Sequence, residues 1–275
     1  MTNAIGIDIG GSKIAACLVD VDSGAIVKSA RVQTQPERGG LAVLAECLGL
    51  AEGLDAGEHA ARMGIPIGIG ICELVNLAGE ITSAVTLDWR GFDLAAEFGS
   101  PVLVESDVRA AAVAEARLGA GRGCANFVYV TVGTGVAFSL MIDGSPYLGA
   151  RGNALILGAP PVENTAGGAG LSRLAGTDSA EEVFDHVEAA GFVHDGTRDL
   201  GRALAWLVNA LDPGLLVVGG GLGLRDDYRE AAVSEMRAGI EANDSRHVRV
   251  VPAELGTDAG AVGVALLATE RIFRA

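Results

Sequence analysis

Asp107 lies where a strand-like run ends and an alanine-rich, helix-like run begins, in the segment VESDVRAAAVAEARLGAG at residues 104–121. A carboxylate at such a junction can cap the helix by accepting hydrogen bonds from its first backbone N–H groups. It can also act as a general base, because a helix N-terminus keeps a carboxylate ionised and oriented. The local sequence leaves both uses open, so the choice depends on the rest of the chain.

Three glycine turns could hold phosphate groups, because unhindered backbone N–H groups form a concavity that attracts phosphate oxygens. The first turn adds a hydroxyl and an ammonium group, and the third suits an adenosine lying against the backbone. Each turn alone is a common structural feature, but three of them in this order favour a nucleotide site. Their residues are Gly10, Gly11, Ser12 and Lys13; Gly133, Thr134 and Gly135; and Gly219, Gly220 and Gly221.

Asp8 lies at the end of the strand-like run before the first glycine turn. Its carboxylate could hold Mg²⁺ there, either directly or through a water molecule. The P-loop signature G-x-x-x-x-G-K-[ST] is absent, and so is a G-x-G-x-x-G after the first strand. A nucleotide site in this chain therefore has to use another architecture.

An internal duplication positions these residues. Segments 4–27 and 127–148 share one layout, in which a strand, a glycine turn, a returning strand and a second turn follow one another. The remaining periodicity indicates an α/β fold. We predict helices near 40–62, 179–190, 198–211, 226–242 and from 258, and strands within 65–71, 99–105, 214–221 and 247–251. We expect two similar lobes around a shared cleft, residues 1–106 and 107–275, with the last helix packing back on the first lobe.

The composition bounds the class of protein. The 275 residues are 49% hydrophobic and carry a formal charge of −15, which argues against a nucleic-acid partner because no basic stripe is present. Four scattered cysteines without a C-x-x-C pair are typical of buried thiols in a reducing compartment. Neither a signal peptide nor a long apolar stretch is evident. We expect a soluble, cytoplasmic protein without a membrane partner.

The order of five segments resembles the ROK family of sugar kinases from residue 4 to about residue 268. These segments are GIDIGGSKI, VLVESDVRAAAVAEARLGAG, VTVGTGVAFSLMIDG, LLVVGGGLG and LGTDAGAVGVALLA. The resemblance implies an actin-like, hexokinase-like ATPase fold of two ribonuclease-H-like lobes, with ATP and sugar in the cleft between them. It also implies that Asp107 is the catalytic base, with capping as a secondary role, that ATP and Mg²⁺ are needed, and that the protein forms a homodimer.

The chain departs from the family where typical members bind sugar and zinc. Those members carry two glutamates and a histidine that contact the sugar, and three cysteines that complete a zinc site with the histidine. Without thiolates or imidazoles we expect no zinc site, and we expect an acceptor that differs from an ordinary aldohexose on that side. A lost sugar site is the alternative. The corresponding residues here are Ile156, Ala159, Val162, Asn164, Ala169 and Leu171.

Other polar residues could contact the substrate instead. The resemblance places Thr86 and Ser106 at substrate-contacting positions, and Glu73 where the family has a small residue. The Glu73 carboxylate could bind substrate hydroxyls or could simply be a solvated loop residue. Arg151 and Asn153 lie on the altered loop and could restore lost polar contacts. We expect Trp89 to pack in the core, and His186 to lie on the helix at 179–190.

The main hypothesis is an ATP- and Mg²⁺-dependent kinase that phosphorylates a hydroxyl of a small-molecule sugar or sugar-like polyol. A C7-cyclitol kinase of secondary metabolism is a specific alternative, because the aldose-recognition residues are missing. A non-catalytic sugar or nucleotide sensor is the alternative from another class. The family's regulators carry an N-terminal winged helix, whereas this sequence begins with the phosphate turn, so DNA binding is disfavoured.

Overall fold

The structure is a computed structural model that describes residues 2–55, 65–157 and 162–273. The chain divides into two compact units, each of which is described by itself. The first unit comprises Met1–Leu118, Leu148–Ala154 and Asp258–Ala275, and the second comprises Gly119–Tyr147 and Leu155–Thr257. The helix that begins at Asp107 therefore lies in the first unit, whereas we had placed the boundary before it. The last helix also lies in the first unit.

The first unit contains a five-stranded sheet in the order β3-β2-β1-β4-β5. The hairpin strands β1, β2 and β3 are antiparallel neighbours, whereas β4 runs parallel to both β1 and β5. The central strands read as nearly continuous apolar runs because helices cover both faces of the sheet. The strands are β1 (Asn3–Ile9), β2 (Lys13–Asp20), β3 (Ala25–Gln33), β4 (Ile67–Ile71) and β5 (Val102–Ser106).

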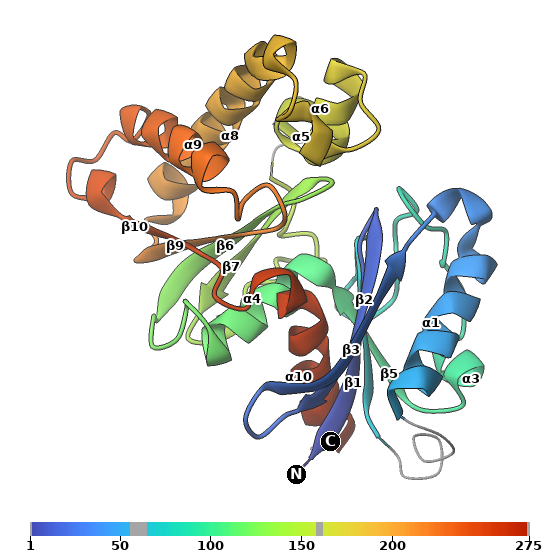
Figure 1. The fold of residues 1–275 in the computed structure, drawn as a ribbon. Helices are drawn as coiled ribbons and strands as arrows, with labels where there is room; N and C mark the ends of the chain where they lie inside the picture. Colours follow the sequence, from blue (N-terminus) through green and yellow to red (C-terminus); the bar gives the residue numbers. More distant parts are fainter. Residues whose placement is uncertain (1, 56–64, 158–161, 274–275) are drawn as a thin grey trace. The chain divides into compact units, whose positions relative to one another are not determined.

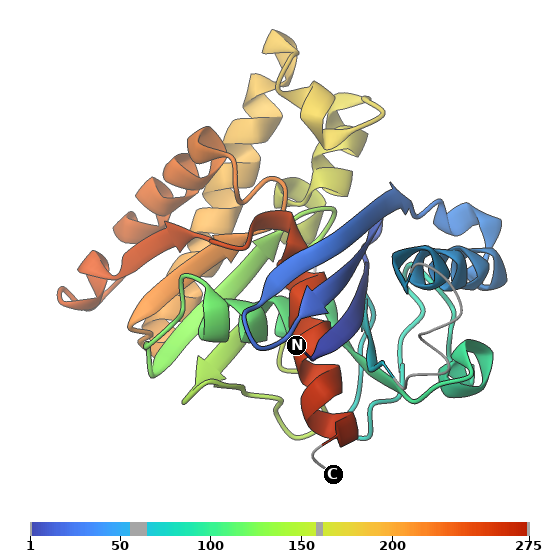
Figure 2. The same cartoon turned by 60° about the horizontal axis from the view of Figure 1, so that its bottom comes forward.

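Helix α1 (Gly40–Asp55) packs on one face of this sheet, and α4 (Asp107–Leu118) and α10 (Ala259–Phe273) pack on the other (Figure 1). Glycines allow the backbones on the second face to approach closely. A Cβ on Gly6 of β1 would lie 1.8 Å from the carbonyl oxygen of Ala261, and a Cβ on Gly263 would lie 1.9 Å from that of Ala110. Helix α10 is thus fixed against both β1 and α4, and it lies beside β1 in both views (Figure 2). A short helix, α3 (Leu94–Phe98), precedes β5.

The second unit contains a sheet in the order β10-β9-β6-β7-β8. Taken from the hairpin end, this order and the strand directions repeat those of the first sheet, because β6 pairs antiparallel with β7 and parallel with β9. The predicted duplication and the α/β fold class are confirmed. The strands are β6 (Asn126–Val132), β7 (Val136–Ile142), β8 (Ser145–Pro146), β9 (Leu215–Gly219) and β10 (Arg249–Pro252).

Helices α8 (Ala190–Leu211) and α9 (Asp226–Ala238) share one apolar core with strands β6 and β9. Shorter helices precede them: α5 (Val162–Ala166), α6 (Gly168–Ala175) and α7 (Ala180–Val183). No helix within residues 2–55, 65–157 and 162–273 has the length and apolar character needed to cross a membrane.

Two helix predictions were wrong in this region. The helix predicted at 179–190 ends at Val183 and is followed by a 3₁₀ turn, Val187–Ala189, because the backbone at His186 is extended, with φ −104° and ψ 110°. His186 therefore does not lie on a helix. Helix α8 begins at Ala190 rather than at residue 198. The predicted helix at 40–62 is present to Asp55, and its remainder lies outside the described residues.

Candidate active site

Asp107 is the first residue of α4 and directly follows β5. Its Oδ1 atom accepts a hydrogen bond from the backbone N–H of Val108 at 2.7 Å and lies 3.5 Å from Ser106 Oγ. Burial raises the pKa of Asp107 to about 6, against the effect of these two hydrogen bonds. A carboxylate with such a pKa is ionised at neutral pH and is a stronger proton acceptor than an exposed aspartate.

Asp93 shows what an aspartate that only caps a helix looks like in this chain. It precedes α3, and its side chain accepts the N–H of Ala96, three residues further on. Asp93 is exposed, whereas Asp107 is partly buried and bonds to the adjacent residue. The two aspartates therefore form a natural pair for separating capping from chemistry.

Asp8 lies next to the last residue of β1, near Asp107. Its Oδ1 atom is buried and has no hydrogen-bond partner among the residues that the structure describes. A Cβ on Gly260 would lie 2.3 Å from Asp8 Oδ2, and a Cβ on Gly70 would lie 3.1 Å from Oδ1 and 3.6 Å from the Cα of Asp107. Two glycines thus leave the space that this carboxylate occupies.

Burial raises the pKa of Asp8 well above its ordinary value, and the negative charges of Asp107 and Asp258 add to this effect. A buried carboxylate oxygen without a donor calls for a partner, and a hard cation is the partner that carboxylates bind best. Asp8 therefore fits a Mg²⁺ ion. No group of three or more histidine, cysteine, aspartate or glutamate residues that could hold a metal ion is present in the described part of the chain.

The first glycine turn joins β1 to β2 in the same unit. The N–H of Gly10 donates to the carbonyl of Lys13 at 3.0 Å, which closes the turn. Thr34 fixes it from the end of β3, because its hydroxyl donates to the carbonyl of Gly10 at 2.7 Å and its N–H donates to that of Ser12 at 3.0 Å. The first unit therefore brings together Asp8, Asp107 and the turn at Gly10–Lys13, while Ser12 and Lys13 at its tip are exposed.

The second unit brings the other two glycine turns together. The backbone N–H groups of Leu222 and Gly223 both donate to the carbonyl of Val132, at 2.9 and 3.0 Å. The turn at 219–221 therefore lies against the end of β6, where the turn at 133–135 begins. Gly220 needs to be glycine, because its φ is +80° and a Cβ would lie 2.5 Å from the Val132 carbonyl oxygen.

The turn at 133–135 is fixed by the start of α6. The N–H groups of Gly168 and Ala169 donate to the carbonyls of Gly133 and Thr134, at 2.7 and 3.0 Å. The carboxylate of Glu163 lies beside this turn, since a Cβ on Gly135 would be 2.4 Å from Glu163 Oε1. The backbone of the turn is thus rigid, while the neighbouring Glu163 side chain is exposed.

Glu73 follows β4, and the structure changes the role that we expected for it. The side chain is buried, and its carboxylate accepts backbone N–H groups from Val85 at 2.9 Å, Thr86 at 2.5 Å and Leu87 at 2.9 Å, together with the hydroxyl of Ser83. Four donors use the acceptor capacity of a carboxylate. Glu73 therefore organises the loop 83–87 instead of facing a substrate.

Thr86 and Ser106 lie close to this arrangement. Burial raises the pKa of the Cys72 thiol to about 12, against the effect of a hydrogen bond with the Thr86 side chain. Ser106 is buried, with its Oγ atom beside Asp107. Trp89 packs in the core as expected, and its indole N–H donates to the carbonyl of Gly40 at 2.9 Å.

Arg109 is an important residue that the sequence reasoning missed. Its side chain is buried and bonds to Glu105, with Nε donating to Oε1 at 2.7 Å. Its Nη1 and Nη2 atoms donate to the carbonyls of Gly152 at 2.6 Å and Val75 at 2.8 Å. The spacing of Glu105 and Arg109, four residues apart, was the available signal. This guanidinium ties the segment around Arg151 and Asn153 to α4.

The residues at the family's sugar and zinc positions are mostly apolar and lie in the core, in a β-bridge or on short helices. Leu171 is completely buried in the core of the second unit, and Ile156 forms a bridge with Ala137 and is 53% exposed. Val162 and Asn164 lie on α5, Ala169 lies on α6, and Ala159 lies outside the described residues. Neither Ile156 nor Leu171 can donate or accept a side-chain hydrogen bond to a sugar hydroxyl.

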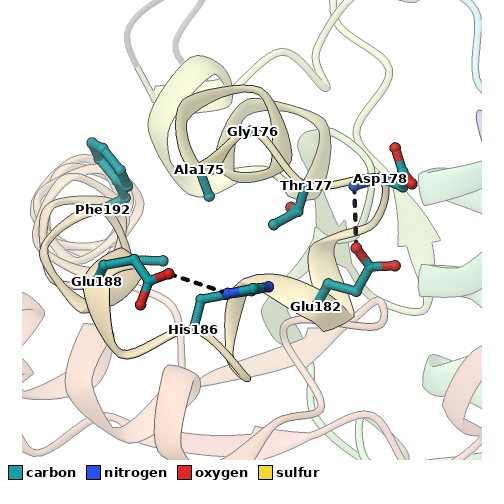
Figure 3. A pocket seen from close by; sticks show the side chains of 9 residues that line it. Ala175, Gly176, Thr177, Asp178, Glu182, His186, Glu188 and Phe192 are labelled. Atoms are coloured by element: carbon teal, nitrogen blue, oxygen red, sulfur yellow. Dashed lines mark hydrogen bonds and ion pairs between the residues drawn. The ribbon is translucent and has the colours of Figure 1, made fainter.

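A hollow of about 240 Å³ lies among α6, α7 and α8 (Figure 3). His186 Nδ1 lies 3.3 Å from Glu188 Oε1 in its lining, and Glu182 accepts the N–H of Asp178. Its lining contains none of the residues of the glycine turns. This acidic hollow is therefore separate from the proposed phosphate-binding residues.

Comparison with known proteins identifies close structural relatives. The model of the ROK family matches residues 4–271. A glucokinase from Streptomyces coelicolor is 31% identical, over 97% of this chain and 97% of that protein. The crystal structure of a ROK family glucokinase from Streptomyces griseus, in complex with glucose and AMPPNP, matches with a TM-score of 0.84 and 27% identity, over 98% of this chain and 99% of that one.

The fold also serves a regulator. The structure of a ROK family transcriptional regulator, a homologue of the Escherichia coli MLC protein, matches with a TM-score of 0.73 and 19% identity, over 97% of this chain and 78% of that one. The fold alone therefore does not distinguish an enzyme from a sensor.

Proposed function

The chain belongs to the ROK family, and on that basis we propose that it is an ATP-dependent kinase acting on a hydroxyl of a sugar or sugar-like polyol. The observation that carries the proposal is Asp107, a partly buried carboxylate at the start of α4 whose pKa burial raises to about 6. A regulator that only binds sugar has no need of a proton acceptor at this position, so this feature favours an enzyme.

In the proposed reaction Asp107 accepts the proton of the acceptor hydroxyl. A bond forms between the hydroxyl oxygen and the γ-phosphorus of ATP, the bond from that phosphorus to the bridging oxygen breaks, and ADP leaves. Because the transition state of phosphoryl transfer is loose, positioning and charge stabilisation supply most of the catalysis. The bond from the Val108 N–H and the contact with Ser106 would hold the carboxylate in one orientation.

Asp8 would hold Mg²⁺, directly or through water, since its buried Oδ1 atom lacks a partner among the described residues. When bound, the metal ion would neutralise charge on the transferring phosphate. Gly70 and Gly260 leave the space in which this carboxylate lies.

The glycine turns would bind the nucleotide through their backbones. We assign phosphate contacts to the turns at Gly10–Lys13 and Gly133–Gly135, and contact with the adenosine to Gly219–Gly221. The first two turns are fixed by hydrogen bonds to their carbonyl groups from Thr34 and from the start of α6, and the third by N–H groups of Leu222 and Gly223 that donate to Val132. Backbone amides of such turns can hold phosphate without a large basic surface.

The acceptor would differ from an ordinary aldohexose. A site that recognises the anomeric end of such a sugar needs polar groups, and Ile156 and Leu171 supply none. A sugar-like polyol such as a C7-cyclitol is therefore the candidate acceptor, with Thr86, Ser106, Arg151 and Asn153 as its proposed contacts. We no longer include Glu73 among these contacts, because its carboxylate is occupied by the loop 83–87.

The test is an ATP-turnover assay with a panel of aldohexoses and cyclitols, with ADP formation as the readout. We expect ADP formation to depend on the acceptor, and at least one cyclitol to be a better acceptor than glucose. If no member of the panel stimulates turnover while ATP still binds, the protein is a sensor and the kinase proposal is wrong.

A further inference from the structure

A second hollow, of about 480 Å³, lies in the first unit, in the same size range as small-molecule binding sites. Two segments line it: the turn that follows β4, and the loop that carries Arg151 and Asn153. The lining residues are Asn76, Leu77, Ala78, Thr82, Arg151 and Asn153.

The two walls of this hollow are fixed to the helix that Asp107 begins. The buried guanidinium of Arg109 donates to the carbonyl of Val75 in one wall and to that of Gly152 in the other. Gly152 has a φ of +84°, and a Cβ there would lie 2.6 Å from the Val75 carbonyl oxygen, so the walls touch at this point. The hollow is thus a built feature of the unit that holds the proposed catalytic base.

The first wall uses most of its polar groups internally. The Asn76 side chain accepts the N–H groups of Ala78 and Glu80, and its amide donates to Glu80 Oε2 at 2.8 Å. The hydroxyl of Thr82 donates to the carbonyl of Leu74 at 3.2 Å. With Leu77 57% exposed beside them, this wall offers an apolar surface to a ligand.

The second wall offers free polar groups. Arg151 and Asn153 are exposed, and within the described residues neither side chain makes a hydrogen bond or an ion pair. Arg151 is the charged residue of the lining, in a chain whose formal charge is −15. Glu80, which lies between the lining residues Ala78 and Thr82 in the sequence, is held by the amide of Asn76.

We propose that this hollow binds an anionic group carried by the acceptor, a carboxylate or a phosphate, through the guanidinium of Arg151 and the amide of Asn153. A planar guanidinium matches either anion with two parallel hydrogen bonds. The apolar first wall would pack against the carbon ring of the acceptor. This inference rests on the proposed function, and it narrows the acceptor from a neutral polyol to an acidic or already phosphorylated one.

The test is isothermal titration calorimetry of the full chain, with and without AMPPNP, using three probes: D-glucose, D-glucuronate and D-glucose 6-phosphate. We expect at least one anionic probe to bind about tenfold or more tightly than glucose, and added salt to weaken that binding. Arg151→Gln should remove this advantage, so that the anionic probes bind no more tightly than glucose. The matched control is Arg122→Gln, which removes the same charge from an exposed position in the second unit and should change nothing.

Preference for glucuronate would identify a carboxylate, and preference for glucose 6-phosphate a phosphate. The inference would be overturned if all three probes bound with equal affinity or if neither anion bound. It would also be overturned if Arg151→Gln and Arg122→Gln lowered the affinity for the anion equally. The turnover assay separates this inference from the proposed function. If the protein phosphorylates neutral polyols and shows no preference for anions, only the proposed anion site is wrong. If it binds an anion but turns over no acceptor, only the proposed kinase activity is wrong.

Discussion

The two sheets share one strand order, but they differ at the ends of equivalent strands. Strand β1 carries Asp8 two residues before Gly10, and the equivalent position of β6, two residues before Gly133, is Thr131. Strand β5 is followed by Asp107, whereas its counterpart β10 is followed by Ala253. One scaffold thus carries two carboxylates at positions where the other carries neutral side chains.

This difference suggests how a duplicated scaffold divides its work. In the first unit the carboxylates are buried together, which raises the pKa of both Asp8 and Asp107. In the second unit the turns at 133–135 and 219–221 present backbone groups, and hydrogen bonds hold both turns at the end of β6. We infer that the first unit supplies charged groups for chemistry, while the second supplies neutral backbone contacts for the nucleotide.

The largest effect is expected when a carboxylate of the first unit is replaced by a neutral side chain. Asp107→Asn should lower kcat by about 10²- to 10⁴-fold, because a positioned general base contributes that much, and should leave nucleotide affinity nearly unchanged. The control is Asp93→Asn, which removes a capping carboxylate from α3. Steady-state kinetics together with nucleotide titration measure both effects. Similar activity losses in the two variants would mean that Asp107 is only a cap.

Equivalent small changes at glycines should affect the two units unequally. Gly260→Ala would place a Cβ 2.3 Å from Asp8 Oδ2, in packed surroundings, so we expect at least a tenfold loss of activity and a lower Tm. Gly135→Ala would meet the end of the exposed Glu163 side chain, which can rotate away, so the loss should be smaller.

Gly53→Ala in α1 is the control for the Gly260 variant, because a Cβ there meets nothing within 4 Å. Alanine in place of glycine inside a helix stabilises by about 1 kcal/mol when nothing opposes it. Thermal unfolding should therefore show a higher Tm for Gly53→Ala. If Gly260→Ala also raises Tm and retains activity, the close packing around Asp8 is wrong.

The pKa of Asp107 predicts how activity and stability depend on pH. Only the ionised carboxylate can accept a proton, so kcat should fall about tenfold per pH unit below about pH 6. A raised carboxyl pKa means that the native state binds the proton more tightly than the unfolded state, so stability should decrease as pH rises from about 4 to 6. Asp107→Asn should therefore raise Tm at pH 8 and have less effect at pH 4. Equal shifts at both pH values would contradict this account.

The smallest expected effect tests a residue that positions a loop without taking part in chemistry. Glu73→Gln keeps the size of the side chain but turns an amide N–H₂ toward N–H donors of the loop 83–87, so we expect a loss of about 1–3 kcal/mol in stability. The acceptor KM should rise more than kcat falls, because Thr86 lies on this loop. Glu97→Gln, on the exposed face of α3, is the control and should be silent. A kcat loss as large as that of Asp107→Asn would place Glu73 in the chemistry instead.

The sequence was sufficient for the features that depend on local patterns. The two hairpins, their glycine turns and the start of α4 at Asp107 follow from period-two strands and turn residues that are contiguous in the chain. The end of α7 at Val183 was not predictable in the same way, since the extended backbone at His186 interrupts a run that has helical periodicity.

The features that the sequence could not show depend on partners far along the chain. Arg109 bonds to carbonyls 43 and 34 residues away, and backbone carbonyls carry no sequence signal. Glu73 is occupied by N–H groups 12 to 14 residues away, so its burial could not be told from exposure by composition alone. Polar side chains that serve the fold and those that face a ligand look alike until the backbone partners are known.

The most direct test of the account is phosphorus-31 NMR of the protein with ATP, Mg²⁺ and the best acceptor from the panel. If Asp107 is a base for phosphoryl transfer, a new phosphomonoester resonance should grow at the rate at which ADP forms, and Asp107→Asn should suppress it. If ADP is accompanied only by inorganic phosphate, or if the variant forms the ester as fast as the unaltered protein, the account is contradicted.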